Sequence, residues 1–218
     1  YAAPLLVAAG ALMLDLGPLG AFGPMLITAG GLVMVAIFVV VWRPHPSLSI
    51  ATMTMGALAW TAGNVQWLGG APIFRVVFWW LAFLVLTIAG ERLELNRVLR
   101  PTRAVRGEFV LAMVTVLGGV AAATWWPEPG VRALGVGLVA LAWWLARYDV
   151  ARRTVRQRGV TRFMAVCLLG GYAWLGVGGA IAAVTGAAMP GLLYDAMLHS
   201  VLLGFVISWS FILPVHEA

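Results

Sequence analysis

The chain has 218 residues, of which 62% are hydrophobic and only 10% are charged. A typical soluble domain carries about 25% charged residues, so this chain has too few polar side chains to cover a water-soluble fold of its length. The composition therefore excludes a cytoplasmic enzyme, a disordered regulator and a secreted disulfide scaffold, and it leaves a polytopic membrane protein.

Apolar segments of helix length follow one another along the chain. A membrane-spanning helix needs about 20 predominantly apolar residues, and eight segments approach or meet that length. Prolines and glycines separate them, because these residues end helices. The expected helices cover residues 1–14, 22–42, 47–67, 73–89, 109–126, 131–145, 163–183 and 192–213. We predict an all-α transmembrane bundle that forms a single domain over residues 1–218, with no soluble domain.

The N-terminal segment gives two further expectations. The first residue is Tyr1, and no basic segment precedes the first apolar run. A cleavable signal peptide begins with a positively charged region, so we expect none here. Because the chain does not start with methionine, we expect that it is processed or that it belongs to a longer protein.

The positive charges are all arginines, 14 of them against eight acids. Five lie in residues 91–108 and six in residues 147–162. Two predicted helices separate these segments, so both fall on the same side of the membrane. Cytoplasmic loops are enriched in Lys and Arg, and we therefore predict that the arginine-rich loops are cytoplasmic. The arginines flank apolar runs and form no exposed basic domain, which favours lipid headgroups over nucleic acid as their partners.

The three histidines are candidates for chemistry, and His199 is the strongest because polar groups inside a bilayer are costly. His199 lies in the last predicted helix, and Asp195 precedes it by four positions on the same helix face. An Asp195 carboxylate that accepts the ring N–H would orient the imidazole for a metal; alternatively, His199 is hydrogen-bonded into a helix interface. His45 and His216 are predicted to share the cytoplasmic rim, where imidazoles hold a haem or copper ion or simply face water and headgroups.

The other polar and charged groups of the helices are expected to serve packing. Asn64 and Gln66 should form hydrogen bonds across helices, near the outer end of the third predicted helix. Arg92, Glu94 and Arg97 lie in a charged stretch at the end of the fourth predicted helix, where Glu94 and Arg97 are spaced to form an ion pair. We expect such pairs to stabilise the cytoplasmic end of that helix.

Tryptophan pairs, glycine pairs and the single cysteine have structural interpretations. Tryptophan favours the membrane interface, although a pair of indoles also suits a planar cofactor, and glycines permit close helix approach. Cys167 lies in an apolar run and is predicted to be a structural thiol. The sequence contains no Walker loop, dinucleotide fingerprint, nucleophile elbow, HExxH or C-x-x-C-H motif. It thus leaves enzymatic activity open, and any haem would be non-covalent.

Two stretches resemble NnrS-like membrane proteins of bacteria. The first is Thr87-Ile-Ala-Gly-Glu-Arg-Leu-Glu-Leu-Asn-Arg97. The second is Met197-Leu-His-Ser-Val-Leu-Leu-Gly-Phe-Val-Ile-Ser-Trp209, with His199, Gly204 and Phe205 at matching positions. The NnrS family is regarded as polytopic, haem- and copper-containing, and linked to nitric oxide stress and denitrification. The resemblance implies a bacterial inner-membrane protein with His199 as a haem or metal ligand and His216 as a second one.

These observations lead to one leading hypothesis and two alternatives. The leading one is an NnrS-like protein that holds b-type haem near His199, with a further haem or copper ion at the rim of His45 and His216, and has a redox or nitric-oxide-related role. A cofactor-free accessory subunit of a larger membrane complex also fits the scarcity of polar groups. A small-molecule transporter fits less well, because it needs a polar or broken-helix midplane.

Overall fold

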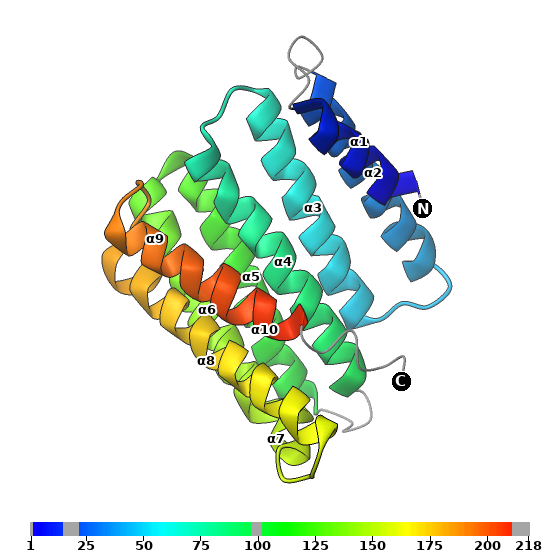
Figure 1. Cartoon of the computed structure of the whole chain (residues 1–218), viewed down its shortest axis with the longest axis vertical. Helices are drawn as coiled ribbons and strands as arrows, with labels where there is room; N and C mark the ends of the chain where they lie inside the picture. The colour runs from blue at the N-terminus through cyan, green and yellow to red at the C-terminus, as the bar shows by residue number, and fades with distance from the viewer. Residues whose placement is uncertain (1, 15–21, 97–101, 211–218) are drawn as a thin grey trace. The chain divides into compact units, whose positions relative to one another are not determined.

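The computed structural model describes residues 2–14, 22–96 and 102–210, and these residues form helices joined by short connections (Figure 1). The predicted all-α class is confirmed. The helices are α1 (Ala2–Leu14), α2 (Gly23–Trp42), α3 (Leu48–Leu68), α4 (Ile73–Leu95), α5 (Arg103–Trp125), α6 (Pro127–Tyr148), α7 (Ala151–Thr154), α8 (Val160–Thr185), α9 (Leu192–His199), the π-helical segment η3 (Ser200–Val206) and α10 (Ile207–Ser210). The last three run on without a break, and the one-turn helix α7 was not predicted.

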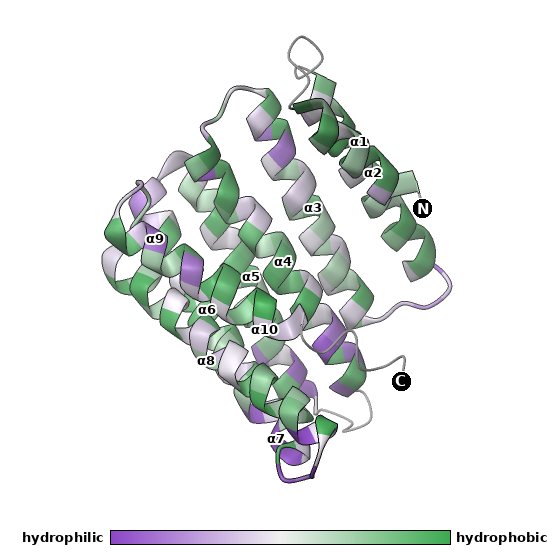
Figure 2. Ribbon diagram, viewed as in Figure 1, coloured by the Kyte–Doolittle hydropathy of each residue, from purple (hydrophilic) through white to green (hydrophobic). Residues whose placement is uncertain are grey.

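Six of the described helices are long and apolar enough to cross a membrane. They are α2, α4, α5, α6, α8 and the continuous helix from α9 to α10. Figure 2 shows hydrophobic residues along most of their length, and hydrophilic residues gathered around α7. The helix α1 is a shorter apolar helix. By length and composition, the chain is a multi-pass membrane protein whose apolar helices suit a lipid bilayer.

The helix α3 has a similar length but is not among the six candidate spans. It buries three threonines, and each hydroxyl donates to the backbone carbonyl four residues earlier, at 2.8–2.9 Å. These residues are Thr52, Thr54 and Thr61. A buried hydroxyl without a partner costs free energy, so these bonds allow α3 to pack in an apolar environment.

Local sequence signals set several helix ends. Ser47 caps α3, because its hydroxyl accepts a hydrogen bond from the backbone N–H of Ile50 at 3.2 Å. Proline stands in the first turn of α2 and of α6, where its missing N–H costs nothing. The helix α8 ends at Gly186, whose φ of +61° lies in the left-handed region that favours glycine.

The chain forms two compact units within its described part, residues 1–90 and residues 91–218. In the first unit, α2 packs against α1 and α3, and Trp60 of α3 stacks on Phe83 of α4 with ring centroids 5.2 Å apart. The indole N–H of Trp80 donates to the Asn64 side-chain oxygen at 3.0 Å. This bond confirms the predicted role of Asn64, whereas the bond expected from Gln66 stays a prediction.

In the second unit, α6 packs between α5 and α8, and α8 in turn packs on α9 and η3. The largest fully buried side chains of this unit are Phe109, Trp144, Tyr172 and Phe205. Glycines bring the helices together: a Cβ at Gly119 would lie 2.3 Å from the backbone nitrogen of Leu134. This close approach confirms the prediction for Gly119, whereas its neighbour Gly118 has no such atom within 4 Å.

Candidate functional site

His199, the main predicted ligand, lies at the end of α9 with its side chain exposed. Its Nδ1 atom is 2.7 Å from the backbone carbonyl oxygen of Asp195. A carbonyl can only accept, so Nδ1 donates, and in the neutral ring Nε2 keeps its lone pair. The predicted i, i+4 relation with Asp195 is present, but the acceptor is the Asp195 backbone and not its carboxylate.

The helix changes its hydrogen-bond pattern directly after His199. Ser200–Val206 is π-helical, a rare form that is frequent at functional sites. Gly204 lies within this segment, and a Cβ there would be 2.5 Å from the Trp174 side chain of α8. The close packing of α8 on this segment needs a glycine at this position. His199 is therefore the last residue before a distorted, tightly packed stretch of helix.

The other two predicted histidines do not add to this site in the described structure. His45 is exposed in the connection between α2 and α3 and belongs to the first unit, whereas His216 lies outside the described residues. Over residues 2–14, 22–96 and 102–210, no group of three or more His, Cys, Asp or Glu side chains is arranged to hold a metal ion. Among the described residues of the second unit, His199 is thus the predicted ligand that the structure places.

A buried ion pair that the sequence did not predict lies at the arginine-rich end of the second unit. Arg92 of α4 donates from Nε and Nη2 to the two carboxylate oxygens of Asp149, at 2.8 and 2.9 Å. Tyr172 of α8 donates its hydroxyl to Asp149 at 3.0 Å, and the Ala151 backbone N–H donates at 2.7 Å. Arg92 and Asp149 are only 7% and 2% exposed. This cluster connects the end of α4, the α6–α7 connection and α8.

A neighbouring contact extends this connection. The side-chain oxygen of Asn96 accepts the backbone N–H of Val150 at 3.0 Å. The ion pair predicted between Glu94 and Arg97 involves a residue outside the described ranges. The apolar part of the fourth helix was predicted to cover residues 73–89 and to continue into the charged stretch, and α4 does continue to Leu95, where Arg92 and Asn96 are buried.

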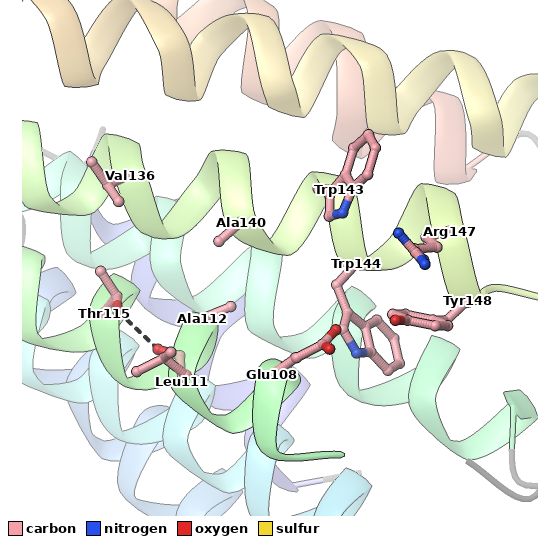
Figure 3. A pocket seen from close by; sticks show the side chains of 10 residues that line it. All are labelled: Glu108, Leu111, Ala112, Thr115, Val136, Ala140, Trp143, Trp144, Arg147 and Tyr148. Carbon is pink, nitrogen blue, oxygen red and sulfur yellow. Dashed lines mark hydrogen bonds between the residues drawn. The ribbon is translucent and has the colours of Figure 1, made fainter. Parts of the chain in front are cut away.

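A groove runs between α5 and α6 towards the same arginine-rich end (Figure 3). It consists of a cavity of about 440 Å³ between α5 and α6 and a second cavity of about 480 Å³ lined by residues of α6 and α7, and the two share Trp143 and Arg147 as lining residues. Leu111, Val136 and Ala140 line its apolar part. Glu108 and Tyr148 also line the first cavity, and Arg152 lines the second. The groove is thus apolar at one end and charged at the other.

The two ends of the second unit differ in charge. Six arginines follow the charged end of the groove in residues 147–162. At the opposite end, Trp125 and Trp126 are exposed, and Glu128 and Arg132 form an exposed ion pair at 2.8 Å. The turn at residues 127–130 holds no arginine, and the nearby Arg132 is paired with Glu128. Exposed indoles at one end and arginines at the other are typical of membrane interfaces.

The fold and these features define a multi-pass helical membrane protein. Over residues 1–213, the chain matches the family described as "Domain of unknown function (DUF8744)". The chain belongs to this family. Comparison with curated proteins and with solved structures gives no match.

Proposed function

We propose that this chain is a bacterial inner-membrane protein in which His199 is an axial ligand of a non-covalent b-type haem, with a redox or nitric-oxide-related role. One observation carries the proposal. The bond from Nδ1 of His199 to the Asp195 carbonyl leaves Nε2 free on an exposed face of α9. A ligating histidine usually makes such a bond with its other nitrogen, which fixes the ring and its tautomer.

The surroundings of His199 are compatible with its being one axial ligand of a haem. Imidazole is a common axial ligand of haem iron, and the exposed ring leaves room for a porphyrin to approach from outside the second unit. Leu203, one turn further along, is 53% exposed and offers an apolar contact for the porphyrin edge. A bound b-type haem supplies electron transfer or the binding of small diatomic ligands. His216, the second ligand that the NnrS resemblance implies, would hold the further haem or copper ion at the rim that it is predicted to share with His45.

The location of the arginines supports a membrane orientation as part of this proposal. The described arginines near the ends of α4 and α6, at the starts of α5 and α8 and in α7 belong to one end of the second unit, whereas exposed tryptophans and the Glu128–Arg132 pair mark the other. Because positively charged loops are retained in the cytoplasm, we infer that the arginine-rich end is cytoplasmic. His199 then lies nearer the opposite membrane face, since α9 begins there.

The proposal is tested by absorption spectroscopy of the purified full chain. We expect a Soret band that shifts on reduction with dithionite and a pyridine haemochromogen spectrum of b-type haem. His199→Gly should lose most of the band, and added imidazole should restore part of it by taking the place of the missing ring. His45→Ala, a matched exposed histidine, should keep the spectrum.

Two results would contradict the haem proposal. One is a colourless preparation that binds no haem on reconstitution, and the other is a Soret band that is unchanged in His199→Gly. A colourless chain that co-purifies in fixed ratio with a larger membrane enzyme would instead support the accessory-subunit alternative.

A further inference from the structure

We propose that the groove between α5 and α6 binds one anionic phospholipid, with the phosphate at Arg147 and Arg152 and an acyl chain in the apolar part. This site is separate from His199, and the proposal does not depend on haem. The groove belongs entirely to the second unit, and its lining residues come from α5, α6 and α7.

The charged end of the groove has the donors that a phosphate needs. Arg147 and Arg152 are both exposed and line the same cavity of about 480 Å³. Within the described residues, neither guanidinium lies within ion-pair distance of a carboxylate. Arginine presents several N–H donors in a planar fork that matches phosphate oxygens. These two side chains are therefore free to bind an anion.

Two aromatic side chains, Trp143 and Tyr148, lie next to Arg147 at this end. The Arg147 guanidinium lies 5.5 Å from the centroid of the Tyr148 ring, and Figure 3 shows it between Trp143 and Tyr148. The Trp143 side chain is 65% exposed and lines both cavities. Tryptophan at this level is typical of the headgroup region of a membrane. We therefore expect the bound phosphate to lie at the depth of the lipid headgroups.

The rest of the groove suits an acyl chain. From Trp143 it continues along α6 past Ala140 to Val136, and along α5 past Leu111 and Thr115. The Thr115 hydroxyl donates to the Leu111 carbonyl at 2.8 Å, so it demands no polar partner from the ligand. Small side chains such as Ala140 make the hollow in which a hydrocarbon chain can lie.

Charge selects an anionic lipid over a zwitterionic one. Arg147 and Arg152 contribute two positive charges, and Glu108 contributes one negative charge, so the lining carries a net charge of +1. A single phosphodiester complements this charge. Basic pockets between transmembrane helices are a known mode of binding anionic headgroups on the cytoplasmic side. The negative charge of Glu108 should weaken the binding of an anionic headgroup. Removing this charge should therefore strengthen the binding, which is the opposite of the effect of removing the arginines.

Native mass spectrometry of the full chain with added lipid tests the proposal. The probes are phosphatidylglycerol and phosphatidylethanolamine with the same acyl chains. We expect one tightly bound phosphatidylglycerol, and binding at least fivefold weaker in Arg147→Gln/Arg152→Gln. The matched control Arg158→Gln/Arg162→Gln removes two exposed arginines from the same end, outside the groove, and should change binding less than twofold.

Two further variants separate the headgroup from the acyl chain. Glu108→Gln should strengthen phosphatidylglycerol binding, and Ala140→Phe should weaken it by filling the apolar part without changing charge. Unfolding temperatures close to that of the wild type show that each variant is folded. Equal weakening in both arginine pairs would overturn the proposal, because it would show unspecific attraction. The proposal would also be overturned if phosphatidylethanolamine bound as tightly as phosphatidylglycerol and Glu108→Gln weakened that binding. Glu108 would then be pairing with the amine of the zwitterionic headgroup.

Discussion

Replacing Asp149 with alanine is expected to lower the free energy of unfolding by about 3–5 kcal/mol, because it leaves the Arg92 guanidinium buried without its partner. Arg92 donates twice to Asp149, and Tyr172 and the Ala151 backbone N–H donate to the same carboxylate. All four donors would lose their acceptor at once. The loss should separate the end of α4 from the α6–α7 connection and from α8.

The measurement is the unfolding temperature of the protein in detergent. Unfolding is monitored by the reaction of the half-buried Cys167 thiol with a fluorogenic maleimide. A loss of this size corresponds to roughly 10 °C for a chain of this length. The matched control is Glu128→Ala, which breaks the exposed pair with Arg132 and should cost at most about 1 kcal/mol. Equal shifts in the two variants would contradict the assignment of the cluster.

A double variant distinguishes a lost interaction from a stranded charge. Arg92→Met/Asp149→Leu removes both charges and should be clearly more stable than Asp149→Ala, because an uncompensated buried charge costs more than an apolar pair of similar size. A double variant as unstable as the single one would show that shape, not charge, is what matters at this position.

Gly119→Ala is expected to have the second large effect, a destabilisation of about 3 kcal/mol at the upper end of the range for overpacking. An alanine Cβ would lie 2.3 Å from the backbone nitrogen and 2.6 Å from the Cα of Leu134. These are backbone atoms of α6, so no side-chain rotation can make room. The helices α5 and α6 would have to separate along their contact.

The neighbouring glycine gives the control for this prediction. Gly118 is exposed on the other side of α5, and nothing lies within 4 Å of the place where its Cβ would stand. Gly118→Ala should therefore be neutral or stabilising by about 0.5–1 kcal/mol, because alanine is the better helix former. The two unfolding temperatures should move in opposite directions or differ by several degrees. A similar small change in both would contradict the close packing of α5 on α6.

The helices themselves could be predicted, because apolar runs of spanning length are separated by prolines and glycines. Their ends were less predictable. The charged stretch that includes Arg92 and Glu94 was expected to prolong the fourth helix beyond its apolar part, and α4 does continue to Leu95, but the length of this extension was not predicted. A charged side chain can continue a helix when a distant partner neutralises it. Composition alone does not reveal that partner.

The buried cluster could not be predicted, since Arg92 and Asp149 are 57 residues apart. One signal was present: Asp149 is the single acid among six arginines in residues 147–162. The tryptophan pair at 143–144 was also ambiguous, because adjacent helical residues point in different directions. Trp143 is 65% exposed beside the groove, whereas Trp144 is 2% exposed and donates to the Val105 carbonyl at 2.8 Å.

The π-helical segment after His199 had no signal in the sequence. A change from α to π hydrogen bonding needs only one additional residue in a turn, and it leaves the apolar composition of Ser200–Val206 unaltered. The helix position of His199 and its relation to Asp195 could be predicted from the spacing. The hydrogen bond from the His199 ring to the Asp195 backbone carbonyl could not be predicted, because it depends on the rotamer of the His199 side chain.

The central claim is that the chain crosses the membrane several times and keeps the arginine-rich end of its second unit in the cytoplasm. Single cysteines at Met189 and Arg158, in a Cys167→Ala background, place one label in the α8–α9 connection and one in the connection that follows α7. A membrane-impermeant maleimide is added to spheroplasts whose inner membrane is intact. Met189→Cys should react at once, and Arg158→Cys should react only after the inner membrane is permeabilised. Equal reaction of both before permeabilisation would contradict the account.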